Sequence, residues 1–336
     1  MTDDLLPGFA LTEPEDDPAR DEVVAAFQAA DPDGERAAAV FRATFDQLYD
    51  GQRTGRYSWD QLYKTEKTHY GTLLEINLRR AFDDVIDDTA DDHPLDYLIR
   101  GHDVDCKYSQ SMGGWMLPPE CFGHLLIVAT ASDLRGKWSL GVVRASDENR
   151  RRGKNRDAKA SLSARGTKQI EWIRFDAALP PNILLNLDPH LLRQVLAPKS
   201  GQARVTELLR QVTEKRIGRN TIATLAQQDD YMARLRDNGN GARTTLRAEG
   251  YLIPGGDYEA HRNVARQLGT SIPEPGEVVS LRVAPAADDD TWAVELDGRR
   301  WRLARSDETT SGPAPRLPDV RKAKPVPPIA PSPELP

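Results

Sequence analysis

The segment 103–109 constrains the fold most strongly, because it places charged residues inside an apolar region. Asp105 and Lys107 alternate with Cys106. In a β-strand, the two charged side chains would therefore point to one face of the sheet and the thiol to the other. The apolar run 125–129 follows soon after and predicts a buried strand. Charged groups in such surroundings are costly unless they are paired or bind a metal ion.

A second carboxylate, Asp96, lies nine residues before Asp105 and can reach the same place. Two carboxylates can hold a hydrated Mg²⁺, which can bind a phosphate and activate water. Lys107 can orient or deprotonate that water. This D-x(n)-[DE]-x-K spacing resembles the PD-(D/E)xK pattern of restriction-endonuclease-like nucleases. A D-x-K triplet alone is common at solvated strand ends, so the apolar context carries the interpretation. Asp91 and Asp92 are alternatives to Asp96 as the first metal ligand.

The distribution of charge is more informative than the net charge of −7. Residues 1–35 contain eleven acidic residues and one basic residue, so the remainder of the chain carries +3. The window 134–170 holds eleven basic and three acidic residues. Such a stretch indicates contact with a phosphate backbone, although a solvated basic loop is the alternative. The candidate DNA-binding residues in this window are Arg150, Arg151, Arg152 and Lys154.

The length of 336 residues predicts two domains. No apolar run approaches the length of a membrane helix, and the N-terminus lacks the features of a secretory signal. The two cysteines, Cys106 and Cys121, favour a reducing cytoplasm, and Cys106 is expected to be a buried strand residue rather than a catalytic thiol. The expected segments are an acidic disordered N-terminus at 1–20, a first domain at 21–178, a second domain at 182–305 and a proline-rich disordered tail at 306–336.

Periodicity in the first domain predicts helices followed by strands. Apolar residues at helical spacing fall in 23–27, 40–48 and 73–82. The expected strands are 95–99, 103–109, 125–130, 138–144 and 171–175.

The second domain has the order helix, helix, glycine turn, basic helix, short strand and glycine loop. This order is typical of a winged helix-turn-helix, with 242–249 as the recognition helix. An ordinary small helical domain with surface arginines is the alternative. The side chains expected to contact base edges or phosphates are Arg243, Thr244, Thr245 and Arg247. Near the end of this domain, Asp297-Gly298 predicts a hairpin turn.

The hexamer 48–53 matches K-x-D-G-x-R, the adenylation motif of DNA ligases, at Asp50, Gly51 and Arg53. Leu48 stands where the motif has its nucleophilic lysine. A leucine cannot form the phosphoramidate with AMP, so neither a working ligase nor a nucleotide cofactor is expected.

In combination with the segments 46–77 and 104–110, these motifs resemble the NaeI-type (type IIE) restriction endonucleases over about 20–305. The resemblance implies an α/β restriction-endonuclease-like (PD-(D/E)xK) domain at 21–178 and a C-terminal winged helix-turn-helix (CAP-like) DNA-binding domain. It also implies a Mg²⁺-dependent homodimer that cuts both strands of double-stranded DNA within a GC-rich palindrome, such as GCCGGC. A second copy of the site, bound by the C-terminal domain, would activate cleavage.

The same resemblance assigns roles to five residues. Glu75, on a helix, would orient a metal-bound water or a neighbouring ligand. Asp96 and Asp105 would bind Mg²⁺ directly, and Cys106 would contribute its backbone carbonyl. Lys107 would position the attacking water. The expected function is therefore site-specific DNA cleavage, and the alternative is a DNA-binding regulator with an inactive nuclease domain.

Overall fold

The computed structural model describes residues 15–87, 95–151, 153, 158–309, 312–320 and 324–326. The chain divides into two compact units. The N-terminal unit comprises Met1–Tyr49 and Ser58–Pro181, and the C-terminal unit comprises Asp50–Tyr57 and Asn182–Pro336. The expected first domain includes 50–57, whereas the structure assigns this segment to the C-terminal unit.

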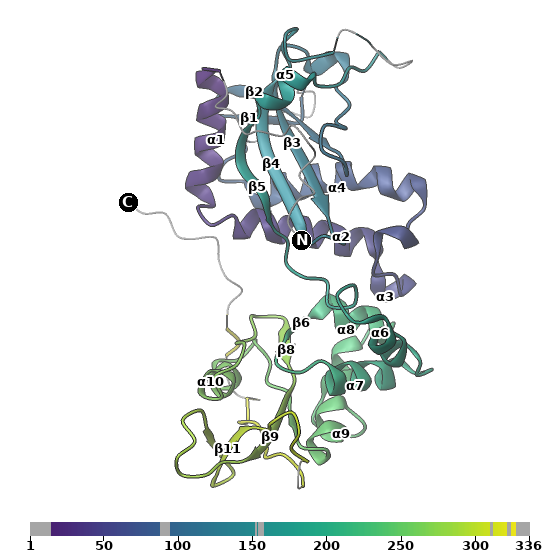
Figure 1. Cartoon of the computed structure of the whole chain (residues 1–336), viewed down its shortest axis with the longest axis vertical. Helices are drawn as coiled ribbons and strands as arrows, with labels where there is room; N and C mark the ends of the chain where they lie inside the picture. Colours follow the sequence, from purple (N-terminus) through teal and green to yellow (C-terminus); the bar gives the residue numbers. More distant parts are fainter. Residues whose placement is uncertain are drawn as a thin grey trace. The chain divides into compact units, whose positions relative to one another are not determined.

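A five-stranded sheet forms the centre of the N-terminal unit, in the order β1-β2-β3-β4-β5 (Figure 1). Its strands are β1 (Tyr97–Ile99), β2 (His102–Tyr108), β3 (Leu125–Ser132), β4 (Lys137–Arg144) and β5 (Glu171–Ala178). Only β2 and β3 run parallel; the other neighbours are antiparallel. All five strands predicted from the sequence are present, and β5 extends three residues beyond its predicted end.

One face of this sheet is covered by three helices, α1 (Pro18–Ala30), α2 (Glu35–Tyr49) and α4 (Lys64–Ala81), as the apolar spacing predicts (Figure 1). They share a core with Val104 and Cys106 of β2. The opposite face is covered by side chains from the segment between β2 and β3, including Trp115, Leu117 and Cys121. The short elements of this unit are η1 (Trp59–Gln61), η2 (Pro119–Cys121) and α5 (Ala164–Lys168).

The end of the acidic N-terminal segment is ordered, in contrast to the prediction of disorder for 1–20. Helix α1 begins at Pro18, and the Asp17 side chain caps it by accepting a hydrogen bond from the Arg20 N–H. Asp17 also forms a bidentate pair with Arg144, with N–O distances of 2.7 and 2.8 Å. The cap and the ion pair fix a segment that composition alone describes as solvated. Residues 1–14 lie outside the described residues.

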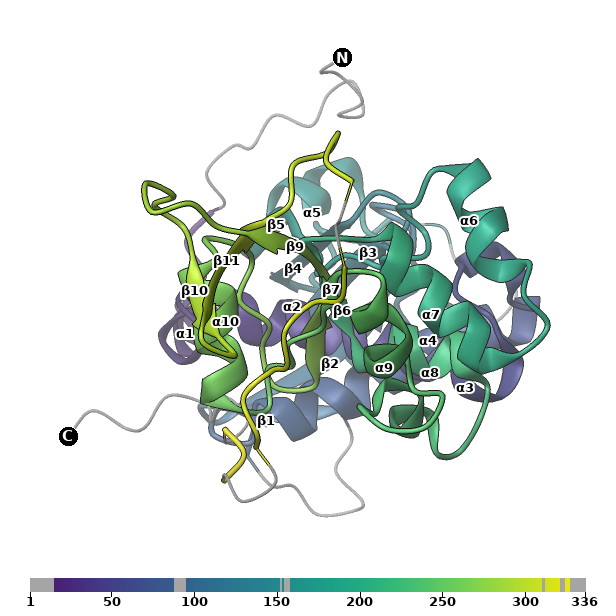
Figure 2. The same ribbon diagram turned by 90° about the horizontal axis from the view of Figure 1, so that it is seen from below.

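The C-terminal unit starts with α3 (Gly51–Thr54), which packs on α8 (Figure 2). Its other helices are α6 (Pro189–Leu196), α7 (Gly201–Gln211), α8 (Arg219–Ala226), η3 (Tyr231–Leu235), α9 (Ala242–Ala248) and α10 (Glu259–Gln267). Its strands are β6 (Arg216–Gly218), β7 (Tyr251–Leu252), β8 (Glu277–Val279), β9 (Leu281–Pro285), β10 (Val294–Leu296) and β11 (Arg299–Leu303). In the parts of the chain that the structure describes, no helix combines the length and hydropathy needed to cross a membrane.

The strands of the C-terminal unit form two small sheets. β6 pairs with β8, and the second sheet has the order β10-β11-β9-β7. The predicted hairpin turn joins β10 to β11, where Asp297 and Gly298 both adopt positive φ angles, of 50° and 72°.

Part of the proline-rich tail packs against the C-terminal unit, so the prediction of disorder over 306–336 does not hold for 312–320. Ala314 is buried, and its N–H donates to the main-chain oxygen of Arg247 at 2.8 Å. Leu317 packs on the adjacent apolar core. Apolar residues between the prolines supply contacts that a compositional argument does not capture. Residues 310–311, 321–323 and 327–336 lie outside the described residues.

A buried ionic cluster joins the end of α2 to the turn between β3 and β4. The Asp133 carboxylate, with a side chain 1% exposed, accepts hydrogen bonds from Arg42 Nη1 at 2.6 Å and from the Tyr49 hydroxyl at 2.9 Å. Arg42 also pairs with Asp46 at 2.8 Å. Burial opposes the charge of Arg42, but Asp46 and Asp133 outweigh it and raise the pKa of the guanidinium. Removing one partner would leave a buried charge poorly compensated.

We expect Asp133→Asn to lower the free energy of unfolding by about 3 kcal/mol, because Arg42 loses a buried counter-charge and one of the two acceptor oxygens becomes an amide NH₂ group. Urea unfolding followed by circular dichroism measures the change. Asp83→Asn is the matched control: Asp83 is 84% exposed and lies 3.9 Å from Arg36. Its effect should stay within about 0.5 kcal/mol. Equal effects of the two substitutions would contradict the importance of the cluster.

Candidate active site

Strand β2 separates its charged and apolar side chains as the alternation predicts. Val104 and Cys106 enter the core beneath the helices. Asp105 and Lys107 point to the opposite face, and the Lys107 Nζ lies 2.7 Å from Asp105 Oδ2. The same Nζ donates to the main-chain oxygen of Cys106 at 3.0 Å. One ammonium group is therefore held beside a carboxylate and a carbonyl.

Asp96 brings the second carboxylate to this place from the residue before β1. Its Oδ2 accepts a hydrogen bond from the Cys106 N–H at 2.8 Å and lies 3.5 Å from Lys107 Nζ. β1 and β2 form a tight hairpin through Arg100 and Gly101, both with positive φ, which brings Asp96 back alongside β2. The structure thus brings together Asp96, Asp105, Cys106 and Lys107. The alternative ligands Asp91 and Asp92 lie outside the described residues.

Glu75 joins this group from helix α4. Its main-chain oxygen accepts a hydrogen bond at 2.7 Å from the hydroxyl of Tyr97, a fully buried residue of β1. Burial raises the pKa of the Glu75 carboxyl, and the charge of Asp96 raises it further. Lys107 and Arg79 act in the opposite direction. Glu75 therefore lies within electrostatic range of the other site residues.

The electrostatics of the site are those of two carboxylates crowded around one cation. Burial raises the pKa of Asp105 to about 7, and the hydrogen bond and charge of Asp96 contribute to the same shift. Lys107 opposes this shift only in part. Burial works against the charge of Lys107, yet its hydrogen bond and ion pair with Asp105, together with the charge of Asp96, raise the pKa of the ammonium. A second cation would relieve the remaining repulsion between the carboxylates.

The donor set fits a hydrated divalent ion. Asp105 Oδ2 is buried beside Lys107 Nζ, at 2.7 Å, and the described residues place no other hydrogen-bond donor on it. Within the described residues, no three His, Cys, Asp or Glu side chains converge to hold a metal. Mg²⁺ keeps several waters and binds proteins through one or two carboxylates, so a complete cage is not needed. Asp96, Asp105 and the Cys106 carbonyl suit such an ion.

The sequence-based search overlooked Arg79 and Tyr97, which contact Asp96 and Glu75 without belonging to a motif. Arg79 donates a hydrogen bond to the main-chain oxygen of Asp96. One sequence signal could have identified Arg79: it lies four residues after Glu75, and residues four apart share a helix face.

Of the candidate DNA-binding arginines in the basic window, Arg150 contacts its own unit. Arg150 pairs with Asp147, and its guanidinium lies 3.6 Å from the ring centroid of Phe122. Arg151 is exposed. Arg152 and Lys154 lie outside the described residues.

The four predicted contact residues of the C-terminal unit all lie on α9. Arg243 is largely buried and donates from Nε to the main-chain oxygen of Ile253 at 2.9 Å. The Thr244 hydroxyl is buried, and Arg247 is half-buried. Among the four, Thr245 alone is exposed. The helix therefore presents a smaller polar surface than its sequence indicates.

The ligase-like hexamer does not form one local structure. Leu48, at the position of the motif's nucleophilic lysine, is an apolar residue buried in the core of the N-terminal unit. Asp50 adopts a left-handed conformation, with φ of 46°, and begins α3 in the C-terminal unit. A Cβ on Gly51 would lie 2.1 Å from Thr224 Oγ1, so this glycine allows α3 to approach α8. Arg53 is exposed.

A mixed α/β unit with one carboxylate and a lysine on β2, and a second carboxylate just before β1, is consistent with a hydrolase of the restriction-endonuclease class. Residues 21–311 match the family described as restriction endonuclease NaeI. The chain is also 46% identical over 302 residues to the type II restriction enzyme NaeI of Lentzea aerocolonigenes, covering 88% of this chain and 92% of that enzyme. The chain belongs to the NaeI restriction endonuclease family. The predicted membership, and the assignment as a type II restriction enzyme, are confirmed.

We expect neither cysteine to react with a thiol reagent in the native protein. Cys106 and Cys121 are both buried, and burial raises the pKa of each thiol, to about 12 for Cys121. Thiolate is the reactive form, so the native protein should show no titratable thiol and the denatured protein should show two. The number of reactive thiols is measured from the absorbance after addition of an aromatic disulfide. Rapid native reaction at Cys106 would contradict its placement in the core.

Proposed function

We propose that the chain hydrolyses both strands of double-stranded DNA in a Mg²⁺-dependent reaction. The observation that carries the proposal is the cluster of Asp96, Asp105 and Lys107, in which the Lys107 ammonium lies 2.7 Å from Asp105 Oδ2 and 3.5 Å from Asp96 Oδ2. Membership of a restriction endonuclease family supports the same chemistry. An inactive nuclease is not favoured, because decay would be expected to remove at least one of these groups.

Each group of the cluster would have a separate role in hydrolysis. Asp96, Asp105 and the Cys106 carbonyl would hold the ion. When bound, Mg²⁺ supplies Lewis-acid stabilisation of charge on the phosphate. Lys107 would orient the attacking water and offset negative charge on the phosphate. Glu75 would orient a metal-bound water or a neighbouring ligand. The products would carry a 5′-phosphate and a 3′-hydroxyl.

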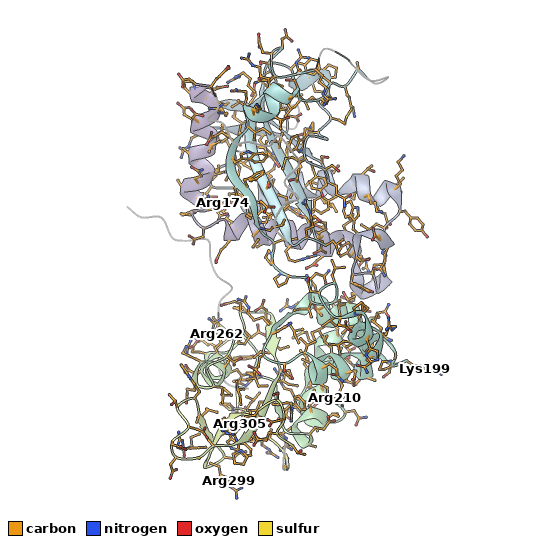
Figure 3. All side chains as sticks on the ribbon, in the orientation of Figure 1. Arg174, Lys199, Arg210, Arg262, Arg299 and Arg305 are labelled. Carbon is orange, nitrogen blue, oxygen red and sulfur yellow. The ribbon has the colours of Figure 1, made fainter. Side chains whose placement is uncertain are left out.

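For the C-terminal unit, we propose a winged helix-turn-helix (CAP-like) that binds a second DNA site. The order α7, β6, α8, α9, β7 and the pairing of β6 with β8 and of β7 with β9 support this arrangement. Exposed basic side chains such as Arg299 and Arg305, labelled in Figure 3, could contact phosphates. Arg210, also labelled there, forms an ion pair with Glu249 at 2.7 Å within the C-terminal unit.

The proposed recognition site is a GC-rich palindrome resembling GCCGGC, cut by a homodimer. A two-fold symmetric protein matches a two-fold symmetric site. The support for this recognition sequence is the family resemblance. Binding of a second copy of the site at the C-terminal unit would activate cleavage at the first.

Cleavage of supercoiled plasmids with one or two GCCGGC sites tests the proposal. We expect discrete fragments with Mg²⁺, none with EDTA and none with Lys107→Ala. Lys137→Ala, which removes a partly exposed lysine paired with Asp176 on the same sheet, is the matched control and should cleave normally. If a second site activates, the two-site plasmid is cut faster, and a short duplex carrying the site stimulates the one-site plasmid.

Three results would count against parts of this proposal. Binding without cutting would favour a DNA-binding regulator. Cleavage at another sequence would overturn the GCCGGC assignment. Equal rates on the two plasmids, with no stimulation by the duplex, would contradict second-site activation.

Metal binding should weaken as the pH falls through about 7. Burial and Asp96 raise the pKa of Asp105 from 3.8 to about 7, so the ion must displace a proton below that value. The half-saturating Mg²⁺ concentration for cleavage should therefore be higher at about pH 6 than at about pH 8, by about tenfold per unit below the pKa. Titration with Mg²⁺ at each pH measures it, and a constant value would contradict the shift at Asp105.

A further inference from the structure

Helix α4 supplies two side chains to the same end of the sheet. Glu75 and Arg79 are four residues apart and therefore share a face of the helix. The Arg79 guanidinium donates a hydrogen bond to the main-chain oxygen of Asp96. It also lies over the ring of Tyr97, 5.6 Å from the centroid. A single side chain thus contacts both the candidate ligand and the first residue of β1.

Asp96 is consequently held at two points. Arg79 fixes its main chain, and the Cys106 N–H fixes its carboxylate at 2.8 Å. Asp96 precedes β1 and is not itself a strand residue, so the short β1–β2 ladder does not determine its orientation alone. The Tyr97 hydroxyl, bonded to the Glu75 main-chain oxygen at 2.7 Å, ties β1 to the same helix.

We propose that Arg79 is a positioning residue that holds Asp96 in its metal-binding orientation. The inference rests on the proposed Mg²⁺-dependent hydrolysis, because it concerns the same site. In this proposal, Arg79 acts on the site through the main chain of Asp96. Residues that hydrogen-bond to metal ligands commonly orient those ligands, and their loss typically weakens metal affinity or activity by about 10- to 100-fold.

An arginine suits this position better than a lysine. Its planar guanidinium can donate in one direction while its face stacks on an aromatic ring. A lysine would keep the charge but would lose the fixed geometry that serves Asp96 and Tyr97 together.

The test compares Arg79→Met with Arg80→Met in the full-length protein. Arg80 is the next residue on α4 and is exposed, and the substitution removes the same charge. Mn²⁺, which prefers the same oxygen ligands as Mg²⁺, serves as the probe, and electron paramagnetic resonance measures its free concentration directly. We expect Arg79→Met to weaken Mn²⁺ binding by about 10-fold or more and Arg80→Met to leave it unchanged.

A second readout separates positioning from a general loss of structure. Affinity for DNA in EDTA, measured by gel shift, should remain at the wild-type value in both variants. Arg79→Lys should bind Mn²⁺ with an affinity between those of the wild type and Arg79→Met. If Arg79→Met does not fold, Arg79→Lys decides the matter, since it retains the charge.

The outcomes distinguish this inference from the proposed function. Wild-type protein that neither binds Mn²⁺ nor cleaves DNA would overturn both. Wild-type protein that binds Mn²⁺ and cleaves, together with a folded Arg79→Met or Arg79→Lys variant of unchanged Mn²⁺ affinity, would overturn the role of Arg79 alone. Equal weakening by Arg79→Met and Arg80→Met would also overturn it, because the effect would then be one of charge.

Discussion

The hydrogen bond from the Cys106 N–H to the Asp96 carboxylate is the interaction on which the site depends. It joins a residue outside the sheet to the strand that carries Asp105 and Lys107. Without it, the second carboxylate would have no fixed place beside the first. The cost of crowding two carboxylates in a partly buried position is then offset by Lys107 and, in the proposed reaction, by a divalent ion.

The sequence predicted the parts of the structure that depend on local periodicity. Alternation in β2 separates Cys106 from Asp105 and Lys107, and helical spacing identifies α1, α2 and α4, because side-chain direction follows from the backbone. The contacts of Arg79 and the docking of Ala314 were not predictable in this way. Both join residues distant along the chain, and no local pattern encodes such pairs.

Counts of basic residues also overstated the surface available for DNA. Arg144 and Arg150 lie in the basic window, yet each is paired with an acidic side chain and contacts its own unit. On α9, Arg243 is largely buried and donates a hydrogen bond to Ile253, at the start of the loop after β7. Charge patterning locates regions rich in cations, but the structure decides which cations remain free to meet a phosphate.

The discontinuity of the C-terminal unit has a consequence for synthesis of the protein. Helix α3 leaves the ribosome long before α8, the helix on which it packs. The N-terminal unit can close around its sheet once β5 has emerged, while the nascent α3 still lacks its partner. Completion of the C-terminal unit therefore requires a segment made early to be captured by one made late. A gene fragment ending at residue 181 would encode α3 without its neighbour, and a fragment starting at 182 would encode the neighbour without α3.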